Sequence, residues 1–224
     1  MSKRQIAVID PGTRVPEIET FNILALESTV PLTYHLPALF GMETLESLPE
    51  DLLGIIVLGS GASVYDEDPW IGALQKWWES KLARNIPSLG LCFGHQLIAH
   101  MFGAKVGFVS EDEEKLIGTR VVNINKGGFW GEATSGDLVV SHRETVVECP
   151  KDFHICASSN AIEFDGIAHQ HQPFWGFQPH LEAYHQFMDH QNLPYDGSEK
   201  PFELGRFMMK KFIEFCAKNA AGKL

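Results

Sequence analysis

The stretch that most constrains the fold is residues 86–103, where an apolar run ends in a cysteine and a helical pattern follows at once. Residues 87–91 are typical of a short buried strand, and Cys92 comes directly after it. Residues 96–101 place apolar side chains at helical spacing and therefore predict a helix. A strand that turns sharply into a helix at a nucleophilic residue is a nucleophile elbow, here in the form Gly-x-Cys-x-Gly.

The glycines on either side of Cys92 are the residues that such a turn requires. Cβ atoms at Gly90 and Gly94 would collide in a tight turn, and glycine has none. The sulfur would project from the carboxyl end of the strand, at a helix N-terminus that favours an anion. Because the thiolate is the reactive form of cysteine, the pattern favours Cys92 as a nucleophile; the alternative is a small buried core thiol.

The first half of the chain alternates between strand and helix patterns. Apolar runs without alternation at residues 5–10, 54–58 and 87–91 predict strands that are buried on both faces, as in a parallel sheet. Residues 16–25 and 69–82 lie between them and predict helices. This order predicts an α/β fold with a doubly wound, mainly parallel sheet.

Between residues 104 and 176 the sequence changes to short β-type runs separated by glycines. These runs predict antiparallel strands that are added to the sheet edge or layered beside it. Residues 175–178 predict one more strand, and residues 201–217 a final helix. No repeat or linker interrupts the sequence, so we expect residues 1–224 to form one domain. The short β-type runs are residues 121–124, 138–140, 145–147, 155–157 and 162–164.

Composition argues against several classes of partner. The 29 acidic residues exceed the 18 Lys and Arg and give a net charge of −11, which disfavours nucleic acid or an anionic membrane as a partner. No apolar run is long enough to span a bilayer, and Met1-Ser2-Lys3-Arg4 leads directly into a predicted strand, so no signal peptide is expected. The 4 cysteines show no Cys-x-x-Cys spacing, which favours a reducing, cytoplasmic location.

Three predicted strands are followed by residues suited to chemistry. A glycine-rich loop at residues 59–61 follows one strand, Cys92 follows another, and His180 and Glu182 come shortly after the strand at residues 175–178. Ligands bind beyond the carboxyl ends of parallel strands. If these strands are parallel neighbours, a Cys-His-Glu triad and an oxyanion hole meet at one sheet edge.

Four motifs, in this order along the chain, resemble the class I (triad) glutamine amidotransferases. Residues 59–66 resemble the oxyanion loop of that family, and residues 90–96, Gly-Leu-Cys-Phe-Gly-His-Gln, resemble its catalytic elbow. Residues 141–144, Ser-His-Arg-Glu, resemble a His-x-Asp segment, and residues 176–182 resemble the closing Gly-x-Gln-x-His-Pro-Glu motif. The Gly-Ser-Gly loop is similar to stand-alone members such as the glutaminase domains of GMP synthases. The resemblance implies a flavodoxin-like three-layer sandwich.

The resemblance also implies a role for each matching residue. Cys92 would be the nucleophile, His180 the base, and Glu182 the group that orients His180. It implies neither a metal nor an organic cofactor. The oxyanion hole would involve Gly59, Ser60 and Phe93, and the substrate would contact Gln96, Ser141, His142 and Arg143.

Three residues depart from the family pattern. Leu181 stands where proline is usual. Because it lies between His180 and Glu182, this departure affects the expected geometry of that pair. Glu144 stands where Asp is usual, and Arg143 where a small residue is frequent. The departures at Glu144 and Arg143 affect the expected substrate pocket. A positive charge at Arg143 favours a substrate that carries an additional carboxylate.

The implied function is an amidase that hydrolyses the γ-carboxamide of glutamine, or a γ-glutamyl compound, through a Cys92 thioester. The sequence contains no glycine-rich nucleotide loop, so either a partner synthase chain receives the ammonia or the protein is a hydrolase, for example a γ-glutamyl peptidase. Two alternatives are an unrelated cysteine hydrolase with the same elbow and a non-catalytic, regulatory protein that resembles the amidotransferases.

Two further patterns have simpler interpretations. His169 and His171 would lie on one face of a strand, but no Cys, Asp or Glu at suitable spacing completes a metal site. The acidic run at residues 111–114 is typical of a solvated loop.

Overall fold

The computed structural model describes residues 4–221. Residues 1–3, on which the expectation of no signal peptide mainly depends, lie outside that range. Its strands are β1 (Ile6–Ile9), β2 (Leu32–His35), β3 (Gly54–Val57), β4 (Ser88–Leu91), β5 (Val106–Phe108), β6 (Leu116–Ile124), β7 (Thr134–His142), β8 (Glu144–Val146), β9 (Phe153–Ser158), β10 (Gly166–His169) and β11 (Phe174–Phe177). Its helices are α1 (Ile18–Glu27), α2 (Pro37–Phe40), α3 (Glu43–Glu46), α4 (Pro69–Leu82), α5 (Phe93–Met101), α6 (His185–His190) and α7 (Lys200–Ala221), with a 3₁₀ turn at Gly128–Trp130.

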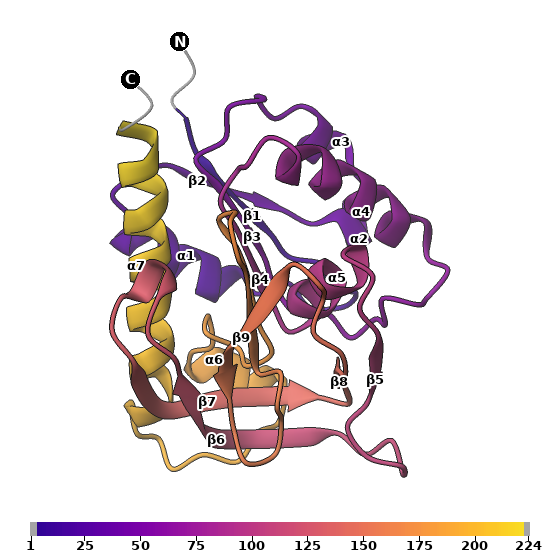
Figure 1. Cartoon of the computed structure of the whole chain (residues 1–224), viewed down its shortest axis with the longest axis vertical. Coiled ribbons are helices and arrows are strands. Elements are labelled where there is room, and N and C mark those ends of the chain that lie inside the picture. The colour runs from indigo at the N-terminus through magenta and orange to yellow at the C-terminus, as the bar shows by residue number, and fades with distance from the viewer. Residues whose placement is uncertain (1–3, 222–224) are drawn as a thin grey trace.

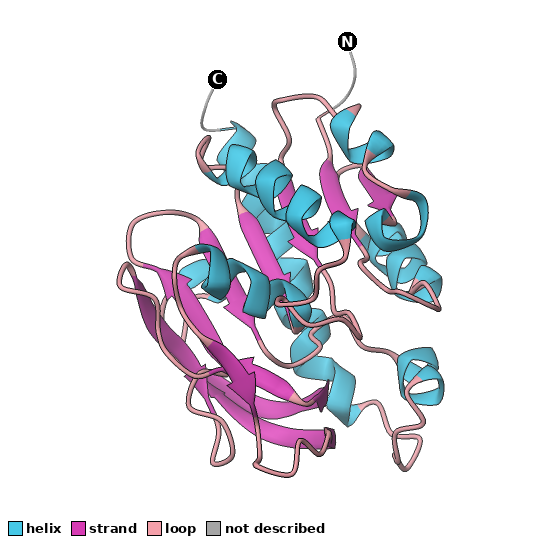
Figure 2. Ribbon diagram, turned by 90° about the vertical axis from the view of Figure 1, so that its right-hand side faces the viewer, coloured by secondary structure: helices cyan, strands magenta, loops and turns pink. Residues whose placement is uncertain are grey.

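One sheet of 9 strands, in the order β2-β1-β3-β4-β11-β10-β9-β6-β7, forms the centre of the described chain. The first five strands in that order run parallel to one another. The remaining four continue the same sheet in antiparallel pairs. The predicted α/β sheet with added antiparallel strands is therefore confirmed, and Figure 2 shows the long antiparallel strands extending away from the helix-covered part.

Helices cover both faces of the parallel strands, as the apolar runs predicted. Along β1, Ile6 and Val8 pack into a core shared with α1 and α7. Ala7 and Ile9, which point to the other face, pack into a core shared with α4 and α5. Figure 1 shows α1 and α7 on one side of the sheet and α4 and α5 on the other. This arrangement is the expected three-layer sandwich.

One predicted strand is wrong. Residues 162–164 form part of a turn between β9 and β10. The N–H of Ser159 donates to the carbonyl oxygen of Ile162 at 2.9 Å, and the Ile162 N–H donates to Ser159 Oγ at 3.1 Å. These two hydrogen bonds form a tight turn, which the apolar side chains at residues 162 and 164 do not predict.

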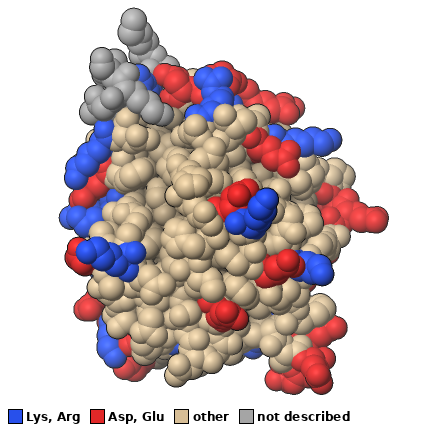
Figure 3. Space-filling view, in the orientation of Figure 1, with Lys and Arg blue, Asp and Glu red and all other residues tan. Residues whose placement is uncertain are grey.

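The surface carries interspersed charges. On the face shown in Figure 3, acidic and basic side chains lie around the margin, and several also lie near the centre among uncharged residues. That face offers no continuous basic surface of the kind that binds a phosphate backbone. Among the described helices, none combines the length and the apolar character needed to cross a membrane.

Candidate active site

Cys92 occupies a strained turn between β4 and α5. Its φ of 49° and ψ of −101° lie in a region that residues with a side chain rarely adopt. The Cys92 N–H donates to the carbonyl oxygen of Phe177 at 2.9 Å, which fixes the turn against the end of β11. The strain therefore sits on the residue that was predicted to be the nucleophile, as is common at functional sites.

The two glycines beside Cys92 are required by close backbone packing. A Cβ atom on Gly90 would lie 2.3 Å from the carbonyl oxygen of Gly94. A Cβ atom on Gly94 would lie 2.3 Å from the carbonyl oxygen of Val57 in β3. The helix thus starts directly against the neighbouring strands, and a larger residue at either position would force them apart.

The structure brings the three predicted triad residues together. In the β4–β11 register, Phe177 lies opposite Leu91, so the segment after β11 runs beside the elbow. His180 Nδ1 lies 2.9 Å from Glu182 Oε1, and both side chains are buried. A Cβ atom on Gly59 would lie 2.6 Å from His180 Cε1 and 3.5 Å from the Cβ atom of Cys92, so the glycine loop adjoins both.

The electrostatics of the site favour a charged imidazolium at His180. Burial lowers the pKa of His180, but the Glu182 carboxylate and the Cys92 sulfur outweigh this effect and raise the pKa to about 10. An imidazolium at His180 stabilises an anionic sulfur beside it. The His180 ring also packs against Phe187 of α6, with ring centroids 4.4 Å apart, which limits its movement.

The loop predicted to form the oxyanion hole is held in place by hydrogen bonds. Ser60 Oγ donates to the carbonyl oxygen of Pro11 at 2.7 Å and accepts from the N–H of Ala62 at 3.2 Å. Phe93 is the first residue of α5, so its N–H has no intrahelical acceptor. The donor roles of the Ser60 and Phe93 N–H groups, with Gly59 at the start of the loop, stay a prediction.

Gln96 connects three parts of the site. Its Nε2 donates to the carbonyl oxygen of Glu144 at 2.7 Å and to Gln178 Oε1 at 3.2 Å. The side chain is buried and joins α5 to the start of β8 and to the residue after β11. Its predicted contact with the substrate is untested, and the amide nitrogen is already used within the protein.

His142 belongs to a buried polar network. Its Nδ1 donates to the carbonyl oxygen of Glu144 at 2.9 Å, and its Nε2 accepts from Arg120 at 3.2 Å. Burial and the charge of Arg120 lower the pKa of His142 to about 3, so the ring is neutral. Arg120 in turn pairs with the buried carboxylate of Asp165. Both ring nitrogens are therefore committed inside the protein, although substrate contact by His142 was predicted.

Of the other two residues predicted to bind substrate, Ser141 is buried and Arg143 lies at the surface. Ser141 Oγ donates to Gln191 Oε1 at 3.3 Å, beyond the end of α6. Arg143 is exposed between β7 and β8. Their substrate contacts also stay a prediction.

The departures from the family pattern leave the His180–Glu182 contact intact. Leu181 is buried beneath α7, where a Cβ atom on Gly205 would lie 2.4 Å from the Leu181 carbonyl oxygen. Glu144 Oε1 accepts from Ser63 Oγ at 3.0 Å, which links the residue to the oxyanion loop.

Two carboxylates near the triad were missed by the sequence reasoning. Asp10, at the end of β1, accepts from the N–H groups of Gly12 at 2.8 Å and Glu17 at 2.7 Å. Burial raises the pKa of Glu17 to about 7, and the charges of Glu182 and Asp10 add to the effect. One sequence feature could have identified Asp10 as a site residue. It follows an apolar strand at its carboxyl end, which is the same edge of the sheet that holds Cys92.

The described residues contain no group of His, Cys, Asp and Glu that could hold a metal ion. His169 Nδ1 accepts from the N–H groups of His171 and Gln172, both at 3.1 Å. The His169 ring also packs edge-on against Phe153 and Phe174. This pair of histidines is thus part of local packing.

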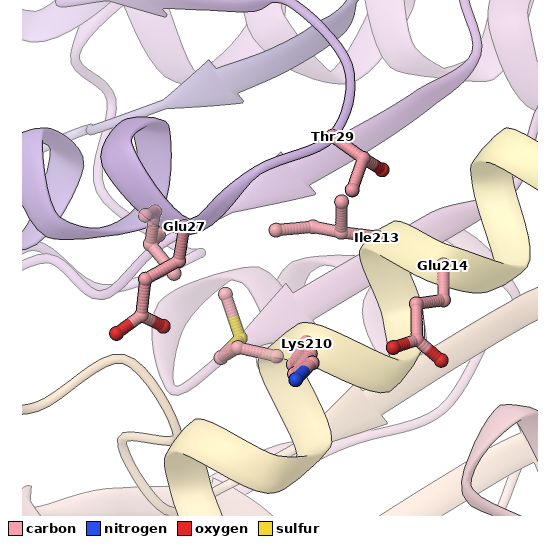
Figure 4. A pocket seen from close by; sticks show the side chains of 7 residues that line it. Glu27, Thr29, Lys210, Ile213 and Glu214 are labelled. Carbon is pink, nitrogen blue, oxygen red and sulfur yellow. The ribbon is translucent and has the colours of Figure 1, made fainter.

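A small pocket between α1 and α7 lies apart from the triad (Figure 4). It adjoins the start of β2, at the amino end of the parallel strands, whereas Cys92 lies at the carboxyl end. The pocket therefore does not belong to the site described above. It is lined by Leu24, Glu27, Thr29, Met209, Lys210, Ile213 and Glu214.

The chain is thus a three-layer α/β sandwich that carries a cysteine on a strand–helix elbow, beside a buried His–Glu pair. These features place it among the α/β proteins with a nucleophile elbow. The family model described as glutamine amidotransferase class-I matches residues 34–196. The chain therefore belongs to the class-I glutamine amidotransferase family, as the four motifs predicted.

Relatives and solved structures agree with this assignment. The chain is 34% identical over 136 residues to one subunit of the glutamine-hydrolyzing GMP synthase of Methanopyrus kandleri, covering 61% of this chain and 64% of the relative. It is 30% identical over 182 residues to the glutamine-hydrolyzing GMP synthase of Wolinella succinogenes, covering 76% and 33%. A glutamine amidotransferase structure from Thermotoga maritima shares the fold with a TM-score of 0.73 and 19% identity, covering 96% of this chain and 99% of that one. The chain spans less than two thirds of the length of these two curated relatives.

Proposed function

We propose that this protein is an amidase that hydrolyses the γ-carboxamide of glutamine, or of a γ-glutamyl compound, through a thioester on Cys92. The observation that supports this most is the buried contact of 2.9 Å between His180 and Glu182, beside the strained elbow that carries Cys92. A buried histidine held by a carboxylate, next to a cysteine at a helix start, is the arrangement that activates a thiol.

In the first half of the proposed reaction, the Cys92 thiolate attacks the carboxamide carbon. The oxygen of the tetrahedral intermediate carries negative charge, and the N–H groups of Phe93 and Ser60 would stabilise it. Such donors contribute about 3–4 kcal/mol each in comparable sites. His180 then gives its proton to the leaving nitrogen, and ammonia or an amine departs.

In the second half, His180 is neutral and removes a proton from water. The hydroxide formed attacks the thioester, Cys92 leaves as a thiolate, and His180 keeps the proton taken from water. The γ-glutamyl group is released as a carboxylic acid, which loses its proton to solvent and becomes a carboxylate. Glu182 keeps the imidazole oriented through both halves and compensates its positive charge.

The names of the relatives suggest where the ammonia goes. Several relatives are named as one subunit of a glutamine-hydrolyzing GMP synthase, which implies a separate synthase chain, and we propose such a partner as the acceptor of the ammonia. The excess of acidic over basic residues supports a small-molecule substrate rather than nucleic acid. All four cysteines are free thiols, which supports a reducing, cytoplasmic location.

Product analysis tests this proposal. The purified chain is incubated with glutamine and with a panel of γ-glutamyl amides, and ammonia, amine and glutamate are measured. We expect release from at least one of them by the wild-type chain and none by Cys92→Ala. Inactivity of the wild-type chain on every member would contradict the proposal.

A stand-alone γ-glutamyl peptide hydrolase is the second candidate. The exposed Arg143 beside the predicted substrate segment favours it, since a peptide leaving group carries a carboxylate. Faster turnover of γ-glutamyl peptides than of glutamine would identify this activity. A purely regulatory role would leave the buried His180–Glu182 pair without a use, and failure of a thiol-reactive glutamine analogue to label Cys92 would favour it.

A further inference from the structure

Two positively charged residues, Lys115 and Arg143, lie immediately beyond the end of the β6–β7 ladder. In that antiparallel pair Leu116 lies opposite His142, and Ile117 lies opposite Ser141. Lys115 precedes the first pair of the ladder and Arg143 follows it. The chain bends at Arg143, whose carbonyl oxygen accepts from the N–H of Val109 at 2.8 Å, so the two cations are neighbours at the end of the ladder without being a ladder pair.

Neither cation is neutralised by a carboxylate. Among the ion pairs of residues 4–221, neither Lys115 nor Arg143 takes part. Within the acidic run beside Lys115, Asp112 is engaged in its own turn, where it accepts from Ser110 Oγ and from the Glu114 N–H. Like charges that lie close together repel each other. An anion bound between them would remove that repulsion.

The Lys115 side chain is held toward the predicted substrate segment. Its Nζ donates to Gln191 Oε1 at 3.2 Å, and the same oxygen accepts from Ser141 Oγ at 3.3 Å. Burial lowers the pKa of Lys115, Cys92 raises it and Arg143 lowers it. Gln191 directly follows α6, and its N–H donates to the carbonyl oxygen of Phe187, whose ring packs against His180, so Lys115 reaches toward the segment that covers His180.

We propose that Lys115 and Arg143 together form a subsite that binds a carboxylate of the substrate beside Cys92. Naming the substrate rests on the proposed function, under which two groups could supply this carboxylate. One is the α-carboxylate of the glutamyl part, and the other is a carboxylate on the leaving amine, as in a γ-glutamyl amino acid or peptide.

Alkylation of Cys92 tests the subsite without requiring amidase activity. Iodoacetate and iodoacetamide are similar in size, and each forms a thioether with the thiolate while iodide leaves, but only iodoacetate carries a carboxylate. The rate constants for both reagents are measured at one pH, with mass spectrometry to confirm modification at Cys92. Their ratio reports the local preference for an anion.

We expect the ratio of iodoacetate to iodoacetamide rates to fall by about tenfold in the Lys115→Gln/Arg143→Gln double variant, and by less in each single variant. His180 is present in all these proteins, so its own attraction for the anion cancels in the comparison. The matched control is Lys126→Gln in the connection between β6 and β7, where the lysine is exposed and pairs with Glu132. A ratio in the double variant equal to that of the wild type would overturn the subsite.

Turnover then distinguishes the two carboxylates. kcat/KM is measured for glutamine, γ-glutamylglycine and γ-glutamylglycinamide with the wild type and the double variant. A loss confined to γ-glutamylglycine assigns the subsite to the leaving group, and an equal loss on all three assigns it to the glutamyl α-carboxylate. No loss on any substrate would overturn the subsite while the amidase stands. If the wild type turns over none of them, the proposed function fails, and the alkylation ratio alone decides the subsite.

Discussion

Glu182 holds the imidazole of His180 from only two residues away, with Oε1 at 2.9 Å from Nδ1 and both side chains buried. The backbone of the same segment is fixed separately, since the His180 N–H donates to the carbonyl oxygen of Val139 in β7 at 2.9 Å. The pair thus depends on one short segment that is attached to the antiparallel part of the sheet. The orientation of His180 therefore depends on Glu182 as well as on the packing of its ring against Phe187.

Replacing Glu182 by glutamine should lower kcat by about 10²- to 10⁴-fold, because an amide cannot compensate the imidazolium. The same change should lower the pKa of His180 from about 10, since the Glu182 charge helps to raise it. The alkaline limb of the pH–rate profile should therefore move to lower pH. NMR titration of His180 checks the second part, and an unchanged alkaline limb would contradict it.

Replacing Cys92 by alanine should abolish turnover, with a loss of at least about 10³-fold in kcat. Cys149→Ser is the matched control, because Cys149 is half-buried and burial raises its pKa, which disfavours its thiolate. Ammonia release and labelling by a thiol-reactive glutamine analogue are measured for both variants. Retention of labelling at another cysteine in Cys92→Ala would show that the nucleophile was assigned incorrectly.

Acid should destabilise the protein through buried neutral histidines, of which His35 is the simplest to test. Burial lowers the pKa of His35 from 6.5 to about 4, and its ring nitrogens lie 2.9 Å from Thr33 Oγ1 and 3.0 Å from Thr44 Oγ1. Because the unfolded chain binds this proton more tightly, His35 should contribute a loss of stability as the pH falls from 6.5 to about 4.

His35→Gln should reduce the slope of the free energy of unfolding against pH in this window by up to about 1.4 kcal/mol per pH unit. Urea unfolding at several pH values measures the slope. The exposed His171 offers a control, His171→Gln, which should leave the slope close to that of the wild type. An undiminished slope in His35→Gln would refute the assignment.

Gly90→Ala should destabilise the protein by about 3 kcal/mol or more, since the new Cβ would lie 2.3 Å from a backbone oxygen that cannot move freely. Gly72→Ala is the matched control, because Gly72 is exposed in α4 with open space around its Cβ position. It should stabilise the protein by about 0.5–1 kcal/mol. Thermal unfolding of both variants measures the difference, and similar melting temperatures would exclude the packing argument.

The elbow and the ends of the parallel strands could be predicted because their causes are local. Glycine spacing around Cys92 reflects contacts within a few residues, and continuous apolar runs reflect burial on both faces. The position of His180 beside Cys92 required one more assumption, that residues 175–178 pair in parallel with the elbow strand, and the β4–β11 register bears it out.

The polar network behind the site could not be predicted in the same way. Arg120, His142 and Asp165 come from separate parts of the chain, and only the pairing of β6 with β7 and the turn before β10 place them together. Partners of buried charges depend on these long-range contacts, so no local pattern marks them. The turn at 162–164 was missed for a related reason, since a hydroxyl at Ser159 completes it.

The position of β11 has a consequence for biosynthesis. It is synthesised after β10 yet inserts between β4 and β10, so β4 has no neighbour on that side until residue 177 has left the ribosome. A growing chain that already contains Cys92 thus carries an open sheet edge, a known site of unwanted pairing, and has no base to activate its thiol. Under the proposed function, Cys92 gains its base in the same late step of folding that closes this edge of the sheet.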